Sequence, residues 1–378
     1  MPDEKLTAYR GGKALRRGWT TGSCAAAASQ AAAMLLLTGI APPEIHLHTP
    51  GGITFCLPVE DAHMSGNAAV CTVRKDAGDD PDITNGVRIT ASVRRIEKSV
   101  TIEGGAGVGR ITRPGLAMPV GEAAINPGPR QQIADAVHRA AQQNGYNGGF
   151  SVTISVKDGE ALAAQTYNGH LGIVGGISIL GTSGIVEPMS EKALVDTIRL
   201  ELDSLYAQGQ RIAFLCPGNY GADFARDTLG LDLERAVKCS NFIGEAFDHA
   251  AYRGYPEILL VGHAGKLVKM AAGVMNTHSS VADARQEIFT AHAALCGAPR
   301  ETLEGLMAAI SVDACVELLD EVNLRQPVLS RIGREMETRI ALRMKGQARV
   351  EFIMFTGKYG VLAESAGARA LCERLKLQ

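Results

Sequence analysis

The sequence has few aromatic residues, little net charge and no long apolar run. Only 5% of its 378 residues are Phe, Trp or Tyr, which argues against the stacking platforms that bind single-stranded nucleic acids. The formal net charge is −2, so no strong field attracts nucleic acid or an anionic membrane surface. The longest apolar stretch, residues 25–37, is interrupted by Ser29 and Gln30 and is too short to span a bilayer. We therefore expect neither a nucleic-acid nor a membrane partner.

The sequence also lacks paired metal ligands. Its eight cysteines are scattered and no two have C-x-x-C spacing, which predicts buried thiols in a reducing compartment. His46 and His48 share one face of a predicted strand, without an evident third ligand, and the acidic turn over residues 76–82 fits no calcium-binding loop. Residues 1–5 lack the apolar region of a signal peptide. We expect a cytoplasmic protein that binds no metal ion of its own.

The chain is instead rich in apolar residues and glycine. Hydrophobic residues make up 46% of it, enough for sizeable cores, and its length suggests two or three domains. The 43 glycines concentrate in short loops between apolar runs. This pattern is typical of an α/β enzyme whose backbone lies close to a ligand.

Residues 1–148 are predicted to form an α+β domain. A helix is expected from Thr21 to Leu37, because threonine and serine precede a long run of alanine, with Thr21 or Ser23 as its N-cap. Between residues 40 and 105, short apolar runs alternate with turn residues, which predicts an antiparallel sheet. This sheet would pack on the first helix and on a second one over 131–143.

Residues 149–378 are predicted to form a Rossmann-like α/β domain with a mostly parallel sheet. Continuous apolar strands alternate here with helices, a pattern that indicates a sheet covered on both faces. The predicted strands cover 176–179, 211–215, 236–239 and 258–262. A late strand over 350–355 is either antiparallel or returned to the first domain, and the sequence leaves both options open.

Glycine-bearing loops follow three of these apolar strands. Ligands of open parallel sheets bind outside the carboxyl ends of the strands, so these loops and the glycine-rich turn over 171–176 are candidates for binding a cofactor. An ordinary strand-to-helix turn is the alternative for each loop taken singly. The candidate cofactor-binding residues are Gly175, Gly176, Gly181, Thr182, Gly218, Asn219 and Gly262.

The start of the first helix is a second candidate site. Helix N-termini attract anions, so a ligand carboxylate or phosphate could bind at residues 20–23 beside Arg17; a capped structural helix is the alternative. His263 lies at a strand-to-helix turn. His278 lies in a polar break between helices, shortly before Asp283 and Arg285. Polar clusters in such breaks are often ligand contacts.

An ordered series of short motifs runs from about residue 17 to about residue 297. The motifs lie at residues 20–24 (TTGSC), 75–82 (KDAGDDPD), 104–110, 119–127, 171–182, 184–190, 217–219, 240–244, 262–267 (GHAGKL), 276–279 (NTHS) and 282–285. Each motif is short, but their order along the chain is specific. The series resembles the cobalt-precorrin-5B C1-methyltransferases, the CbiD-type enzymes of anaerobic cobalamin synthesis.

This resemblance implies transfer of the methyl group of S-adenosylmethionine to C1 of cobalt-precorrin-5B, giving cobalt-precorrin-6A. It also implies a wide pocket for a tetrapyrrole with many carboxylates, which arginine, lysine and helix N-termini bind well. The candidate substrate-binding residues are Arg17, Thr20, Thr21, Ser23, Arg110, Lys266 and Arg285. Any general base would be His263, His278 or Asp283, and the resemblance leaves open whether the reaction needs one.

Two other functions stay open from the sequence. Residues 104–109 have the composition of a phosphate loop but lack the G-x-x-x-x-G-K-[ST] pattern, so a nucleotide-dependent phosphotransferase is the alternative enzyme. A non-catalytic tetrapyrrole carrier is the alternative without catalysis. Binding of S-adenosylmethionine would separate these functions. The sequence does not fix the oligomeric state, and a homo-oligomer remains open.

Overall fold

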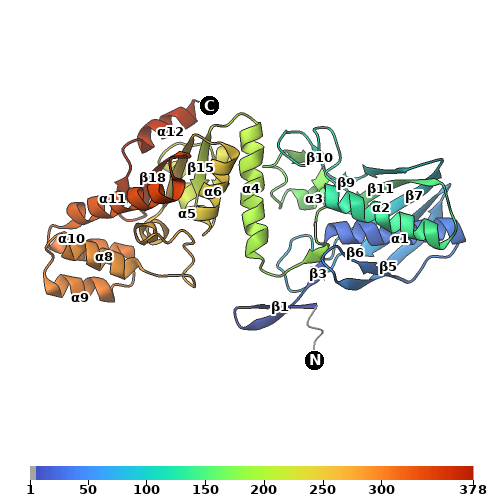
Figure 1. The fold of residues 1–378 in the computed structure, drawn as a ribbon, viewed down its shortest axis with the longest axis horizontal. Helices are drawn as coiled ribbons and strands as arrows, with labels where there is room; N and C mark the ends of the chain where they lie inside the picture. The colour runs from blue at the N-terminus through green and yellow to red at the C-terminus, as the bar shows by residue number, and fades with distance from the viewer. Residues whose placement is uncertain (1–5, 378) are drawn as a thin grey trace. The chain divides into compact units, whose positions relative to one another are not determined.

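The computed structural model describes residues 6–377, and the chain divides into two compact units between Glu191 and Lys192 (Figure 1). The expectation about a signal peptide concerns residues 1–5, which lie outside the described residues. The first unit extends past the predicted end at residue 148, because the strand β11 (Gly149–Val156) lies inside its sheet. The boundary therefore differs from the sequence prediction.

The first unit is built on a six-stranded sheet with the order β4-β5-β6-β7-β11-β8. Neighbouring strands are antiparallel except β11 and β8, which are parallel. Side chains alternate along the strands, so that Ile89, Ala91 and Val93 of β7 are buried. The other strands are β4 (Glu44–His48), β5 (Thr54–Ser65), β6 (Ala68–Arg74), β7 (Arg88–Ile96) and β8 (Val100–Gly104).

Two helices, α1 (Thr21–Thr38) and α2 (Pro127–Gln143), pack together, and α1 covers the buried face of this sheet (Figure 1). Residues 24–28 of α1 are fully buried, because alanine lets neighbouring elements approach a helix on every side. The helix ends where Gly39 takes a left-handed conformation and donates its N–H to the carbonyl of Leu35. The predicted helix over residues 21–37 is thus present.

Short elements complete the first unit. They are β1 (Thr7–Arg10), β2 (Lys13–Arg16), β3 (Gly18–Trp19), β9 (Gly107–Val108), β10 (Arg110–Ile111), α3 (Gly159–Ala163), β12 (Ile173–Val174), β13 (Gly176–Ile177) and β14 (Ile185–Val186). β14 pairs with β3, and β13 pairs with β9. Through these pairs, residues 176–186 near the end of the unit lie beside the earlier strands β9 and β3.

The second unit contains a five-stranded sheet with the order β16-β15-β17-β18-β19. The first four strands are parallel and β19 (Gly360–Glu364) is antiparallel to β18. The predicted strand over 350–355 is β18 (Arg349–Thr356). It stays in the second unit and pairs in parallel with β17. The two predicted options, an antiparallel strand or a return to the first unit, therefore do not describe its pairing with β17. The antiparallel strand is β19, which the sequence pattern did not predict. The remaining strands are β15 (Ile212–Cys216), β16 (Ala236–Lys238) and β17 (Glu257–His263).

Helices cover both faces of this sheet. On one face, Ile212 and Phe214 of β15 pack in a core with α5 (Asn219–Asp227) and α12 (Ala368–Lys376). On the other face, Ala213 and Leu215 pack in a larger core with the remaining helices. Those helices are α4 (Glu191–Ala207), α6 (Ile243–Arg253), α7 (Ala264–Leu267), η3 (Val268–Ala272), α8 (Arg285–Ala294), α9 (Arg300–Ala308), α10 (Val312–Glu321) and α11 (Arg325–Met344).

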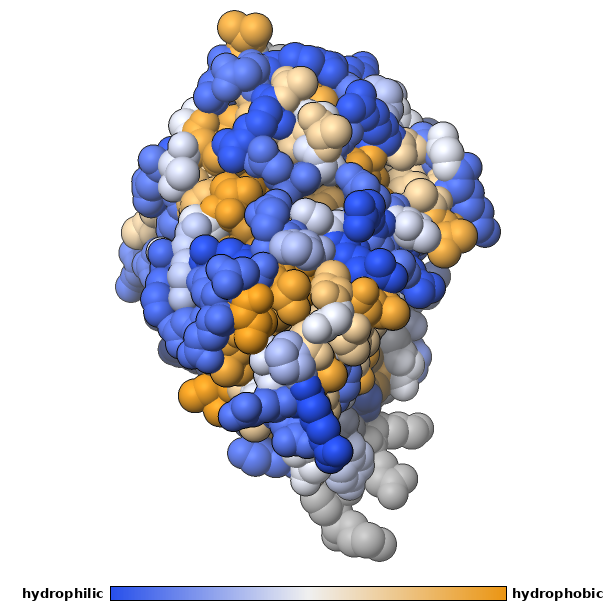
Figure 2. Space-filling view, turned by 90° about the vertical axis from the view of Figure 1, so that its left-hand side faces the viewer, coloured by the Kyte–Doolittle hydropathy of each residue, from blue (hydrophilic) through white to orange (hydrophobic). Residues whose placement is uncertain are grey.

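The surface carries scattered apolar side chains. Figure 2 views the second unit from the side of α8–α11 and shows hydrophobic residues in small groups among hydrophilic ones. Within residues 6–377, no helix combines the length and the apolar character needed to cross a membrane. All eight cysteines are free thiols; Cys56 is exposed, Cys296 is partly buried and the other six are buried.

Candidate functional site

The carboxyl edge of the second sheet is the first candidate site. The chain runs from β15 to β16 on one side and then to β17 on the other side of β15. Crossovers in opposite directions leave a crevice where the order reverses, and ligands of open α/β sheets bind there. The loops after β15 and β17, at residues 217–220 and 263–266, flank this point. Two of the predicted glycine loops therefore share one edge.

Gly218 shapes the loop after β15. Its dihedral angles, φ 96° and ψ −177°, are essentially restricted to glycine. It precedes α5, whose first turn has no side-chain cap, so the N–H groups at the start of α5 attract an anion. A Cβ atom at this position would lie 3.5 Å from Nζ of Lys266. The start of α5 and the Lys266 ammonium group therefore lie side by side.

Lys266 brings a half-buried positive charge to the same edge. Its Nζ donates to the carbonyl of Ser240, 3.3 Å away, in the loop after β16. Burial lowers the pKa of Lys266, and the charge of Lys269 adds to this effect. Nearby, Nζ of Lys238 donates to Oδ1 of Asn219 at 3.3 Å. The edge thus combines two ammonium groups and an open helix start, which suits a carboxylate or phosphate.

Gly262 has a different role. A Cβ atom there would lie 2.3 Å from Leu267 Cδ1 and 2.9 Å from Pro217. The residue is therefore small because β17 packs closely against these side chains. It does not open space for a ligand, in contrast to the cofactor-binding role that the sequence predicts.

The side chain of His263 caps α7 at this edge. The N–H of Gly265 donates to its Nδ1 at 3.1 Å, so a neutral ring carries its proton on Nε2. Burial lowers the pKa of His263, and the opposing effect of the Asp313 charge is smaller, so the environment favours the neutral ring. The ring lies 6.0 Å from that of the exposed Tyr220 and 5.7 Å from that of Phe355. The geometry suits a donor to a ligand better than a general base.

The other two candidate bases, His278 and Asp283, lie in the polar break after η3, and both already accept hydrogen bonds there. The N–H of Ser280 donates to Nδ1 of the exposed His278 at 3.1 Å, which again leaves the proton of a neutral ring on Nε2. Both carboxylate oxygens of Asp283 accept from Arg285 at 2.6 Å. This hydrogen bonding lowers the pKa of Asp283. None of the three candidates therefore offers an uncommitted strong base.

Lys269 holds this break in place. The sequence pairs it with Lys266 on one helix face as a possible contact for ligand carboxylates. Its side chain is instead buried, and Nζ donates to the carbonyls of Thr277 at 3.2 Å and Ala282 at 2.9 Å. The sequence gives no signal for this role, because only the fold brings those carbonyls to the lysine.

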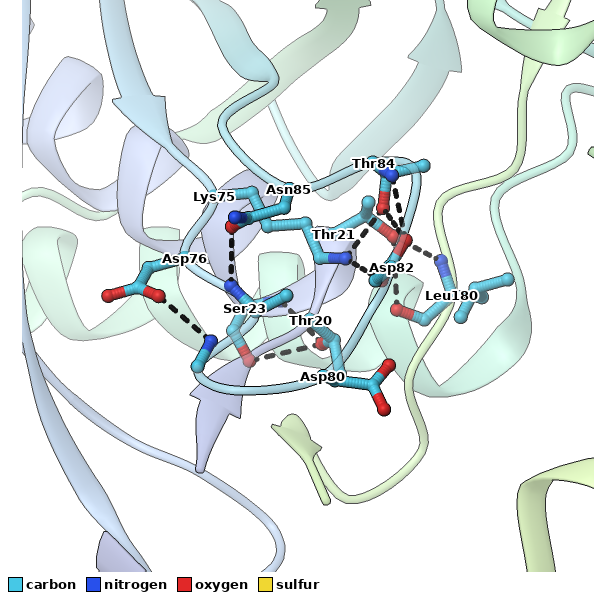
Figure 3. A network of polar contacts seen from close by, with 12 residues as sticks. Thr20, Thr21, Ser23, Lys75, Asp76, Asp80, Asp82, Thr84, Asn85 and Leu180 are labelled. Carbon is cyan, nitrogen blue, oxygen red and sulfur yellow. Dashed lines mark hydrogen bonds and ion pairs between the residues drawn. The ribbon is translucent and has the colours of Figure 1, made fainter. Parts of the chain in front are cut away.

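The start of α1 is closed by the chain itself (Figure 3). Thr20 is the N-cap, and its Oγ1 accepts from the N–H of Ser23 at 3.2 Å. The N–H of Gly22 donates to the carbonyl of Leu180 at 3.0 Å, and Oγ of Ser23 donates to the carbonyl of Gly184 at 2.7 Å. This corrects two expectations: the cap is Thr20 rather than Thr21 or Ser23, and the N–H groups of Gly22 and Ser23 are bonded within the chain rather than open to a substrate carboxylate.

The loop over residues 180–184 covers the start of α1 and is hydrogen-bonded to it. Thr21 accepts from the N–H of Leu180 at 2.9 Å through Oγ1, and a Cβ atom at Gly181 would strike Thr20. The candidates Gly175, Gly176, Gly181 and Thr182 thus all lie in the first unit. Only Gly218, Asn219 and Gly262 lie in the second unit, so the seven predicted cofactor residues do not share one sheet edge.

Three predicted substrate-binding arginines are paired with acids. Arg17 lies 3.6 Å from Glu187, Arg110 donates to Glu103 at 2.9 Å, and Arg285 is held by Asp283. A substrate carboxylate would have to replace these acids. Lys266, in contrast, donates to a carbonyl, and no ion pair with an Asp or Glu is found for it among the described residues.

The acidic turn over residues 76–82 is bound internally (Figure 3). Asp82 pairs with the buried Lys75 and accepts from Thr84. Burial raises the pKa of Asp82, but the charge and hydrogen bonds of Lys75 and Thr84 outweigh it and lower the pKa. Asp76 is paired with Arg16. These carboxylates are therefore structural.

Residues 104–109 form no phosphate loop. The N–H of Gly105 donates to the carbonyl of Ile154 at 2.7 Å, and a Cβ atom at Gly107 would lie 2.0 Å from the carbonyl oxygen of Val156. The glycines thus allow close packing against β11. Close packing therefore explains the many glycines of residues 104–109, which suggested a phosphotransferase in the sequence.

Comparison with known proteins adds to this geometry. The profile of the CbiD family matches residues 8–188, and that of the CbiD C-terminal domain matches residues 276–366. The chain is 50% identical over 92% of its length to the cobalt-precorrin-5B C(1)-methyltransferase of Ruminiclostridium cellulolyticum, covering 90% of that protein. It is 39% identical to the enzyme of the same name from Citrobacter koseri, over 100% of both chains.

A solved structure is also similar to this chain. The crystal structure of the cobalamin biosynthesis protein CbiD from Archaeoglobus fulgidus has 31% sequence identity, with a TM-score of 0.41. The match covers 75% of this chain and 88% of that one.

Proposed function

Because the chain belongs to the CbiD family, we propose that it transfers a methyl group to C1 of cobalt-precorrin-5B in the synthesis of cobalamin. The relatives that carry this activity in their names align over nearly the whole chain. Neither the phosphotransferase nor the carrier is supported by these relatives, and the packed glycines of residues 104–109 argue against the former.

The proposed methyl donor is S-adenosylmethionine, bound at the carboxyl edge of the second sheet in a Rossmann-like unit. The observation that carries this placement is the position of Lys266 beside Gly218, at the point where the strand order reverses. The amino-acid part of this donor carries a carboxylate, which Lys266 and the open start of α5 would bind. The exposed ring of Tyr220 would offer a face to the adenine.

The donor supplies an activated methyl group on its sulfonium, so the protein's main tasks are alignment and exclusion of water. His263 would donate through Nε2 to a ligand oxygen and hold its orientation. Arg110 and Arg285 remain candidates for substrate carboxylates, each by exchange with its present acid partner. The cobalt ion belongs to the substrate in this proposal.

The activity is tested by incubating the purified protein with cobalt-precorrin-5B and S-adenosylmethionine that is isotopically labelled in its methyl group. We expect a product heavier by one labelled methyl group, detected by mass spectrometry. A substrate that stays unlabelled under conditions where a homologous enzyme is active would contradict the function.

The placement of the donor is tested by calorimetric titration of Lys266→Met with S-adenosylmethionine. Loss of a charge-assisted contact of about 1.5–3 kcal/mol should weaken binding by roughly tenfold to a hundredfold. Lys376→Met, on α12, removes an exposed lysine that pairs with Glu373 and should leave the affinity unchanged. Equal affinity in both variants would move the donor to another part of the chain.

A further inference from the structure

The outer face of the β4–β5 hairpin brings three different metal-binding side chains together. Ile45 and Leu47 of β4 point into the core, so Glu44, His46 and His48 point outward. In β5 the same alternation turns Cys56 outward, and the strand register places it directly opposite His46. The sequence shows the two histidines on one face, but only the strand pairing reveals Cys56 as their neighbour.

The ligand atoms of Glu44, His46 and Cys56 all lie within 4.8 Å of one another. Oε1 of Glu44 is 3.1 Å from Nε2 of His46. Within residues 6–377, no other three His, Cys, Asp or Glu side chains converge in this way. Cys56 is also the one exposed cysteine of the eight.

A carboxylate, an imidazole and a thiolate together favour zinc as the bound ion. Zinc bonds to sulfur at about 2.3 Å and to nitrogen and oxygen at about 2.0–2.2 Å, so tetrahedral ligand atoms lie roughly 3.3–3.7 Å apart. The three ligand atoms already lie within 4.8 Å of one another, so rotations of these exposed side chains would have to close only the remaining difference. Calcium and magnesium require oxygen ligands and do not favour a thiolate or an imidazole. His48 hydrogen-bonds to Thr54 at 3.1 Å, which leaves the fourth position to water.

We propose that Glu44, His46 and Cys56 bind one Zn²⁺ ion on the outer face of the first sheet. The ion replaces the thiol proton of Cys56, which is released to solvent, and it is separate from the cobalt of the substrate. It cross-links β5 to β4, which is the edge strand of the six-stranded sheet. Edge strands with unpaired N–H and C=O groups invite association, and the cross-link would hold this one in register.

The test uses the full chain after removal of metals with a chelator and without any tetrapyrrole. Zn²⁺ is titrated in competition with a chromophoric chelator, and Co²⁺ is used as a spectroscopic probe. We expect one equivalent of tight binding and a near-ultraviolet charge-transfer band from a cobalt–thiolate bond. Cys56→Ser should abolish the band, and both Cys56→Ser and His46→Gln should weaken Zn²⁺ binding at least tenfold.

The matched controls are His63→Gln and Cys296→Ser. His63 is an exposed histidine of β5 that also lies beside an acid, Asp61, at 3.5 Å, and Cys296 is a partly buried thiol. Both controls should bind Zn²⁺ like the wild type. Binding that survives Cys56→Ser and His46→Gln, or that needs millimolar zinc, would show an adventitious ion only and overturn the proposal. The side chains of His46, Cys56 and His63 are exposed, so circular dichroism should show an unchanged fold for their variants.

Discussion

The main-chain N–H of Gly265 donates to Nδ1 of His263 at 3.1 Å. This single contact fixes the tautomer of a neutral ring and uses the lone pair that a general base would need. It also gives the histidine a structural task as the cap of α7. Its contribution to stability can therefore be measured separately from its proposed contact with a ligand.

His263→Asn should reduce the pH dependence of stability. Burial lowers the pKa of His263 below its ordinary value of 6.5, so the unfolded chain binds this proton more tightly than the folded one. The free energy of unfolding of the wild type should then fall as the pH drops below about 6.5. Asparagine can keep the cap without titrating.

Urea unfolding at about pH 7.5 and about pH 5.5 measures this difference. Burial also lowers the pKa of His292, so part of the pH dependence should remain in the variant. Identical pH dependence in the two proteins would show that His263 is not buried as described.

Lys75→Met should destabilise the first unit by about 3 kcal/mol, because it leaves the partly buried carboxylate of Asp82 without its ion-pair partner. Chemical denaturation measures the change. Lys98→Met, at an exposed position of the same unit, should change the stability by less than about 0.5 kcal/mol. Similar values for the two variants would contradict the structural role of the acidic turn.

Ser23→Ala should lower the free energy of unfolding by about 1–2 kcal/mol, because its buried hydroxyl donates to the carbonyl of Gly184. Arg17→Ala removes a partly exposed pair with Glu187 and should cost less than about 1 kcal/mol. Tetrapyrrole titrations of the same proteins decide the functional question. A large loss of substrate affinity in Arg17→Ala alone would show that the substrate binds near the start of α1 after all.

Gly218→Ala should weaken the binding of S-adenosylmethionine, because alanine at φ 96° strains the loop by about 1–3 kcal/mol. Gly175→Ala is the matched control: its φ of 82° is also positive, but it lies in the first unit with open space around it. Calorimetric titration should show a loss of affinity only for Gly218→Ala. The opposite pattern would place the donor near the turn over residues 171–176.

The sequence predicted those elements whose signals are local. The alanine-rich run after Thr20 and the glycine at position 39 define α1, and the β-branched run at 258–262 defines β17. Their periodicity and caps depend on neighbouring residues alone. The carboxyl edge near Gly218 and Lys266 was predicted for the same reason, because a loop after a parallel strand has a known place in such a sheet.

The sequence could not predict features that depend on partners far along the chain. Residues 180–184 follow an apolar strand-like run, so they resemble a ligand loop until Ser23 is seen to bond to Gly184. The boundary was placed too early because β11 is recognised as an inner strand only from its pairing with β7. Likewise, the neighbours of His46 depend on strand register.

The closure of α1 by residues 180–184 also affects synthesis of the protein. Ser23 and Gly184 are 161 positions apart, and the strand β14, which pairs with β3, ends at Val186. During translation the first helix is made early, but the N–H of Gly22 and the hydroxyl of Ser23 gain their partners, the carbonyls of Leu180 and Gly184, only when nearly half of the chain has left the ribosome. The nascent first unit is therefore exposed to aggregation and proteolysis for most of that interval.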